Sequence, residues 1–210
     1  MSSDIISEED VLRSKFGTVG PLALAKSRPA LDKYSRQFIA MSPFLVISTA
    51  DSSGKADLSP RGDPPGFVHM IDDKTIVIPD RPGNNRLDTM ANIVANPNVG
   101  CLFFIPGFED TLRLNGQARI TEDAELLRQC SVNGKAPKVG ILIRIDEVFM
   151  HCAKALKRSK LWAEDYRQDR AQMPSIARII LDQTCDTGVD ETVAEKADTQ
   201  VEGDYKTGLY

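Results

Sequence analysis

From Phe44 onward, short apolar runs alternate with tight turns, and this spacing restricts the fold more than any other feature of the chain. Phe44–Ala50, Thr75–Pro79 and Val99–Ile105 are runs of this kind. Asp51–Gly54 is a typical hairpin turn after the first of them. Short strands at regular spacing with turns between them favour a closed or nearly closed antiparallel barrel.

The clearest strand pattern starts at Thr111. Through Ile120 the residues alternate strictly between apolar or small side chains and polar ones. The polar set comprises Thr111, Arg113, Asn115, Gln117 and Arg119. This pattern predicts a half-exposed antiparallel strand, or a strand whose polar face lines a site. Val139–His151 predicts a further strand, long enough to bend round the edge of a barrel.

Helical patterns flank the strands. Pro29–Met41, Asn85–Ala95, Glu122–Cys130 and Ser175–Thr184 are predicted helices, and residues 186–210 are either a loosely packed helix or a tail. Ser7 and Asp10 predict a capping pair for a further helix near the N-terminus. We expect one domain over residues 1–210, with N-terminal helices (1–42), a barrel (43–152) and a C-terminal helical extension (153–210).

Composition restricts the partners. Hydrophobic residues make up 41% and charged residues 27% of the 210 residues, a normal balance for a soluble protein. The net charge of −4 disfavours nucleic acid and anionic membranes as partners. No apolar run approaches the roughly 18 residues of a membrane span, and the acidic start is unlike a secretory signal. We therefore expect a cytoplasmic protein.

Several common sites are missing from the sequence. The four cysteines form no C-x-x-C pair, and His69 and His151 are the only histidines, so no metal site is expected. Neither G-x-G-x-x-G nor G-x-x-x-x-G-K-[ST] is present, and there is no G-x-S-x-G. These absences disfavour the common dinucleotide, P-loop and serine-hydrolase sites.

Two loops instead concentrate arginine in rigid turns. Ser59–Gly66 carries Arg61, and Pro79–Arg86 carries Arg81 and Arg86. Guanidinium groups suit phosphate, and a helix N-terminus adds free N–H groups. Asn85 is expected to cap the following helix, which would put Arg86 in its first turn. We interpret Arg61 and Arg86 as phosphate ligands and Arg81 as a solvated surface charge.

The motifs together resemble the pyridoxamine 5′-phosphate oxidase-like, FMN-binding split-barrel family, and in particular its bacterial branch of probable FMN-dependent enzymes. The resemblance covers about residues 30 to 165. It is carried by Phe44–Ala50, Asp57–Phe67, Gly83–Asp88, Asn96–Gly100, Thr111–Gly116, His151–Ala155 and Arg158–Trp162.

This resemblance implies a mainly β fold with helical extensions, an α+β class built on a six-stranded antiparallel split β-barrel. It also implies a homodimer with one FMN in each of two clefts at the subunit interface. The cofactor-binding residues implied are Ser59, Pro60, Arg61, Asn84, Asn85, Arg86, Thr111, Arg113, Lys154 and Arg158. Arg61, Asn85 and Arg86 would hold the phosphate, and Ser59-Pro60 would form a wall of the ring slot. A positive charge near the ring would come from Arg113, Lys154 or Arg158, the last two from the partner subunit.

The function implied is an FMN-dependent oxidoreductase that transfers hydride through flavin N5 and acts on an unidentified small molecule, with a reduced nicotinamide as a candidate electron donor. Leu156–Trp162 lacks the Arg-x-His-Asp-Arg signature of true pyridoxamine phosphate oxidases, so that substrate is not expected. The alternatives are a flavin carrier or sensor without turnover, or a split barrel that binds haem or a deazaflavin. Haem is disfavoured because only His69 and His151 are available as axial histidines. No catalytic residue is marked out by the sequence.

Overall fold

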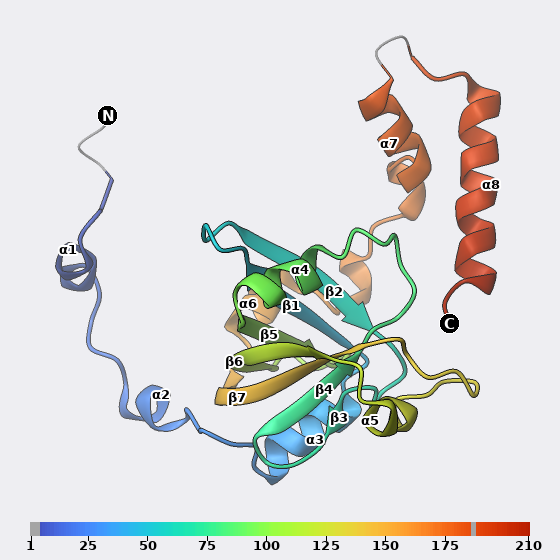
Figure 1. Ribbon diagram of the computed structural model, residues 1–210. Helices are drawn as coiled ribbons and strands as arrows, with labels where there is room; N and C mark the ends of the chain where they lie inside the picture. Colours follow the sequence, from blue (N-terminus) through green and yellow to red (C-terminus); the bar gives the residue numbers. More distant parts are fainter. Residues whose placement is uncertain (1–4, 186–187) are drawn as a thin grey trace.

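An antiparallel sheet forms the centre of the computed structural model, which describes residues 5–185 and 188–210 (Figure 1). Within these residues the sheet has seven strands in the order β2-β1-β5-β6-β7-β4-β3. The strands are β1 (Phe44–Ala50), β2 (Ala56–Gly62), β3 (His69–Met70), β4 (Thr75–Pro79), β5 (Asn98–Phe104), β6 (Thr111–Thr121) and β7 (Gly140–His151). The edges of the sheet are therefore β2 and β3.

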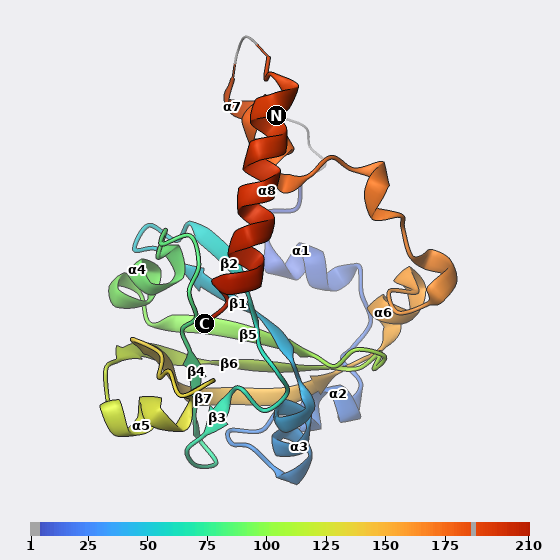
Figure 2. The same cartoon turned by 90° about the vertical axis from the view of Figure 1, so that its right-hand side faces the viewer.

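Helices lie around the sheet and beyond it (Figures 1 and 2). They are α1 (Glu9–Ser14), α2 (Pro21–Ala25), α3 (Lys33–Met41), α4 (Asp88–Ala95), α5 (Ala124–Gln129), α6 (Lys154–Ser159), α7 (Ile176–Thr184) and α8 (Glu191–Thr207), with 3₁₀ turns at Glu164–Tyr166 and Arg170–Gln172. Helix α4 packs on β1, β2 and β6, whereas α7 and α8 pack on each other. Among the described residues, no helix combines the length and the apolar character needed to span a membrane.

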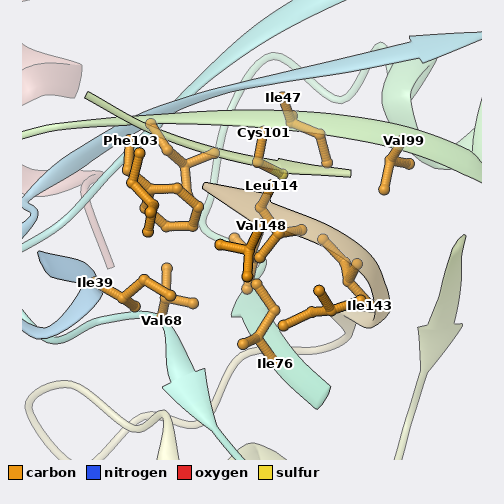
Figure 3. Packing of buried hydrophobic residues seen from close by; sticks show 14 of the residues in the cluster. Ile39, Ile47, Val68, Ile76, Val99, Cys101, Phe103, Leu114, Ile143 and Val148 are labelled. Carbon is orange, nitrogen blue, oxygen red and sulfur yellow. The ribbon is translucent and has the colours of Figure 1, made fainter. Parts of the chain in front are cut away.

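The core lies on the inner face of the sheet (Figure 3). The buried positions of β1, β5 and β6 alternate with exposed or half-buried ones, as the hydrophobic pattern predicted. Ile47, Phe103 and Leu114 are among the fully buried side chains. Cys101 also faces this core, and burial raises the pKa of its thiol to about 12.

The structure confirms a mainly antiparallel sheet with helices and corrects several details. The described residues form seven strands in an unclosed sheet rather than six in a closed barrel, and the additional edge strand β3 has only two residues. Helix α4 begins at Asp88 rather than at Asn85, and α1 has no side-chain cap in place of the expected Ser7–Asp10 pair. Residues 191–207, left open by the sequence, form α8.

Gly116 allows β6 and β7 to approach closely. The register between the two strands shifts between Asn115 and Gly116, where a β-bulge interrupts the ladder. A Cβ atom on Gly116 would lie 2.2 Å from the carbonyl oxygen of Arg144 and 3.0 Å from Cγ2 of Ile143. Both neighbours belong to β7, so β6 has no room for a side chain at position 116.

Gly116→Ala is therefore expected to lower the free energy of unfolding by about 3 kcal/mol, measured by chemical denaturation. Gly203→Ala is the control, because a Cβ atom there meets nothing within 4 Å and the position is helical. That control should stabilise the protein by roughly 0.5 kcal/mol. Equal effects of the two substitutions would contradict the close approach.

Candidate functional site: a cleft between two arginine loops

The two arginine-bearing segments face each other across a cleft of about 880 Å³, and the first of them carries Arg61 on strand β2 rather than in the expected turn. One wall is β2 from Asp57 to Gly62, and the other runs from the end of β4 to the start of α4. Phe67, residues 135–138 and Tyr210 complete the lining. Six residues implied by the family resemblance line this cleft: Ser59, Pro60, Arg61, Asn84, Asn85 and Arg86.

Two crossed ion pairs connect the walls. Arg61 Nη1 on β2 lies 3.3 Å from Asp80 Oδ1, which follows β4. Arg81 Nε lies 2.6 Å from Asp63 Oδ2, which follows β2. Because β2 is an edge strand and β4 lies near the other edge of the sheet, the pairs link the two sides of its opening.

The structure corrects the interpretation of Arg81. Its side chain is 17% exposed rather than solvated. Besides pairing with Asp63, its Nη2 donates to the carbonyl oxygen of Cys130 at 2.9 Å. Both contacts hold protein groups together, so Arg81 has a structural role at the edge of the cleft.

Arg61 differs from Arg81 because one of its donors has no partner. Among the described residues, its Nε is the buried side-chain nitrogen that makes no hydrogen bond. An unsatisfied buried donor costs about 1–3 kcal/mol, and a charged one costs more. Arg61 also lines the cleft, so its guanidinium lies beside the space that a ligand would occupy.

The N-terminus of α4 supplies further donors. Its N-cap residue, Leu87, has φ 59° and makes no side-chain capping bond, so N–H groups of the first turn are not capped. Asn85 has φ 57°. Left-handed backbone at two non-glycine residues so close together is typical of a loop held in a special shape.

The sequence predicted Arg86 in the first turn of α4. In the structure Arg86 lies in the loop before this helix, which begins at Asp88. Its Nε lies 2.8 Å from Asp88 Oδ2, and its side chain is 72% exposed. Its backbone N–H donates to Asn84 Oδ1 at 3.1 Å. Asn84 thus shapes the loop, while the exposed Arg86–Asp88 pair leaves the guanidinium accessible to a ligand.

The other four implied residues lie outside the cleft. Thr111 is buried on β6, and Lys154 and Arg158 are exposed on α6. Arg113 is exposed on the outer face of β6, with its guanidinium carbon 5.3 Å from the centre of the Phe149 ring. Within one chain the implied residues therefore form two groups.

The second group has a positive character. Lys26 Nζ lies 4.5 Å from the centre of the same Phe149 ring, which is itself 5.7 Å from the ring of His151. Partial burial, together with the charges of Lys26 and Arg113, lowers the pKa of His151. This surface combines an aromatic ring with cations, which suits a planar ligand or an anion.

Sequence reasoning missed the carboxylates and the tyrosine of the cleft. Asp63 lies within the segment Ser59–Gly66, and Asp80 directly precedes Arg81. The sequence does not indicate which arginine each aspartate pairs with. Tyr210 is 147 residues from Asp63 in sequence, and its hydroxyl lies 2.6 Å from Asp63 Oδ1. Nothing in the local sequence indicates this contact.

Among residues 5–185 and 188–210, no three His, Cys, Asp or Glu side chains are grouped to hold a metal ion.

Comparisons with known proteins identify the class. A family model described as pyridoxamine 5′-phosphate oxidase matches residues 31–152, and the chain belongs to this family. This confirms the resemblance inferred from the motifs. No curated protein matches the chain.

Three solved structures are similar at low identity. HupZ from Group A Streptococcus is 18% identical, with a TM-score of 0.47, over 57% of this chain and 93% of its own. A putative pyridoxamine 5′-phosphate oxidase from Lactobacillus delbrueckii is 16% identical, with a TM-score of 0.47, over 59% and 98%. An FMN-binding protein from Syntrophomonas wolfei is 13% identical, with a TM-score of 0.42, over 56% and 88%.

Asp80 makes the stability of the cleft depend on pH. Burial raises the pKa of its carboxyl, and this outweighs the opposing attraction of Arg61. A raised folded-state pKa contributes stability that is present below the unfolded-state pKa and lost as pH rises through the folded-state value. The window therefore starts near 3.8 and extends upward to the raised pKa.

Asp80→Asn is expected to remove this contribution. Relative to the variant, the wild-type protein should lose free energy of unfolding as pH rises from about 4 toward neutrality. Urea denaturation at several pH values measures the difference. A difference that is independent of pH, or that grows with pH, would contradict the raised pKa.

Proposed function

We propose that the chain binds FMN in the cleft and acts as an FMN-dependent oxidoreductase on a small molecule. The observation that carries the proposal is the guanidinium of Arg61, which pairs with a single carboxylate and lines a cleft that also contains the uncapped N-terminus of α4. This combination favours an anion such as a phosphate monoester. Membership of the pyridoxamine 5′-phosphate oxidase family supports a flavin as the molecule that carries the phosphate.

The phosphate would lie between β2 and α4. Arg61 offers its guanidinium from one side, and the first turn of α4 offers N–H groups from the other. Arg86 can turn from Asp88 toward the phosphate, because an exposed pair costs little to separate. Asn84 and Asn85 would hold the loop in the left-handed shape that exposes these donors.

The rest of the cleft has room for a ring system. Its volume of about 880 Å³ falls in the upper part of the range for small-molecule sites. Ser59 and Pro60 on β2 would provide one wall of the slot for the isoalloxazine ring. When bound, FMN would supply the redox chemistry, and the protein would bind and orient it.

A second copy of the chain would complete the site. The outer face of β1, β2 and β5 carries exposed Phe44 and Leu58 and half-buried Val46, Leu102 and Phe104. A continuous apolar face on a sheet suits a subunit interface. Arg113 on β6 lies opposite Leu102 in the same face. We propose that dimerisation brings the partner's Arg113, with Thr111, Lys154 and Arg158, toward the cleft.

The charge of this second group gives it a role toward the ring. Positive charge beside the N1–C2=O region would favour the reduced, anionic state of a flavin. Arg113 is the best placed of the four, because stacking on Phe149 orients its guanidinium on an exposed surface.

Purified protein is expected to contain or take up FMN, visible in its absorption spectrum and identified after release. Arg86→Ala should weaken FMN binding by about 1.5–3 kcal/mol, because it removes a charge-assisted bond to phosphate. Titration calorimetry measures the change. Arg144→Ala is a matched control, since Arg144 is also exposed and pairs with an aspartate two residues away, at 3.1 Å. Absence of FMN binding overturns the proposal, and equal effects of the two variants remove Arg86 from the site.

Anaerobic mixing of the FMN-bound protein with reduced nicotinamide distinguishes an enzyme from a carrier or sensor. The flavin of an enzyme is reduced and loses its visible absorption, whereas the flavin of a carrier or sensor does not.

Leu58→Asp is expected to raise the dimer dissociation constant by at least about tenfold, because it places a charge in the apolar face. Leu58 is 69% exposed in the single chain. Ile180→Asp on α7, which is 51% exposed and lies away from the sheet, is the control and should have little effect. Sedimentation velocity over a concentration series measures both. A wild-type monomer, or equal dissociation of the two variants, would overturn the interface.

A further inference from the structure

We propose that Tyr210 closes the phosphate end of the cleft and thereby selects FMN over FAD. The inference rests on the proposed function, and it adds which flavin the cleft admits. In FMN the phosphate is the end of the molecule. In FAD the same phosphate is joined to a second phosphate and an adenosine. A cleft that binds FAD must therefore be open beyond the first phosphate.

Three polar contacts fix Tyr210 at the cleft. Its hydroxyl donates to Asp63 Oδ1 at 2.6 Å, and the other oxygen of Asp63 accepts from Arg81. The guanidinium carbon of Arg81 lies 5.7 Å from the centre of the Tyr210 ring. Lys135 Nζ donates to the main-chain oxygen of Tyr210 at 3.1 Å. The ring is therefore held against the crossed ion pairs from several directions.

This position is next to the proposed phosphate donor. Asp63 is two residues beyond Arg61, so the loop that presents Arg61 is the one that holds the tyrosine hydroxyl. Tyr210 and residues 135–138 line the same cleft as Arg61 and Arg86. A ligand that continued past the phosphate on this side would meet the ring of Tyr210.

Tyr210 is the part of the C-terminal segment that lines the cleft. Helix α8 packs on α7, and Tyr210, three residues beyond the end of α8, contacts Asp63 and Lys135. Tyr205 and Leu209, near Tyr210 in sequence, are 57% and 58% exposed. Hydrogen bonding to Asp63 raises the pKa of Tyr210, which keeps its hydroxyl protonated as the donor.

The test compares the dissociation constants for FMN and FAD in the full-length protein, measured by titration calorimetry. Wild type should bind FMN at least tenfold more tightly than FAD. In Tyr210→Ala the ratio of the FAD constant to the FMN constant should fall at least tenfold, with the FMN constant within about threefold of wild type. Tyr210→Phe, which retains the ring, and Tyr205→Ala, which alters an exposed tyrosine of α8, should keep the wild-type ratio.

Each outcome decides the proposal. If FMN binds and Tyr210→Ala leaves the ratio unchanged, the role of Tyr210 is wrong while the flavin site remains. If wild type binds neither flavin, the proposed function fails and the selectivity fails with it. If Tyr210→Ala does not fold by circular dichroism, Tyr210→Val provides the smaller side chain, and its ratio is read in the same way.

Discussion

The crossed ion pairs between β2 and the end of β4 are the interaction on which the site depends. The sheet runs from β2 to β3 without a hydrogen-bonded seam between its edges. Arg61–Asp80 and Arg81–Asp63 link the two sides at the position of the cleft. Asp63 is 1% exposed, and removing one partner of a buried pair typically costs about 3–5 kcal/mol. The cleft therefore has walls held at a fixed separation before any ligand is present.

The same pairs give the two central arginines different roles. Arg81 donates hydrogen bonds to Asp63 and to the carbonyl oxygen of Cys130, so it links the two walls of the cleft. Arg61 fastens them through one nitrogen and keeps a buried donor without a partner. Burial raises the pKa of Asp80 even beside Arg61.

Most of the sheet could be predicted from the sequence, whereas the site could be predicted only in part. Alternation marked β6 correctly, and the run Thr75–Pro79 matches β4. The predicted start of α4 was wrong, because the left-handed backbone at Asn85 and Leu87 delays the helix to Asp88. Six of the ten implied site residues share one cleft, because the end of β2 and the segment after β4 lie side by side and are joined by the two ion pairs. The pairing of Asp63 with Arg81 and Tyr210 depends on distant segments, which no local pattern records.

Strand β2 has no fully buried residue along its length, and it pairs with β1 on one side only. Its free edge is held by charges instead of by a neighbouring strand. Elements with few buried contacts open at low free-energy cost while the rest of a domain stays folded. A ligand held by Arg61 would therefore add to the ion pairs that anchor β2, suppress its local opening and slow the exchange of its backbone amides.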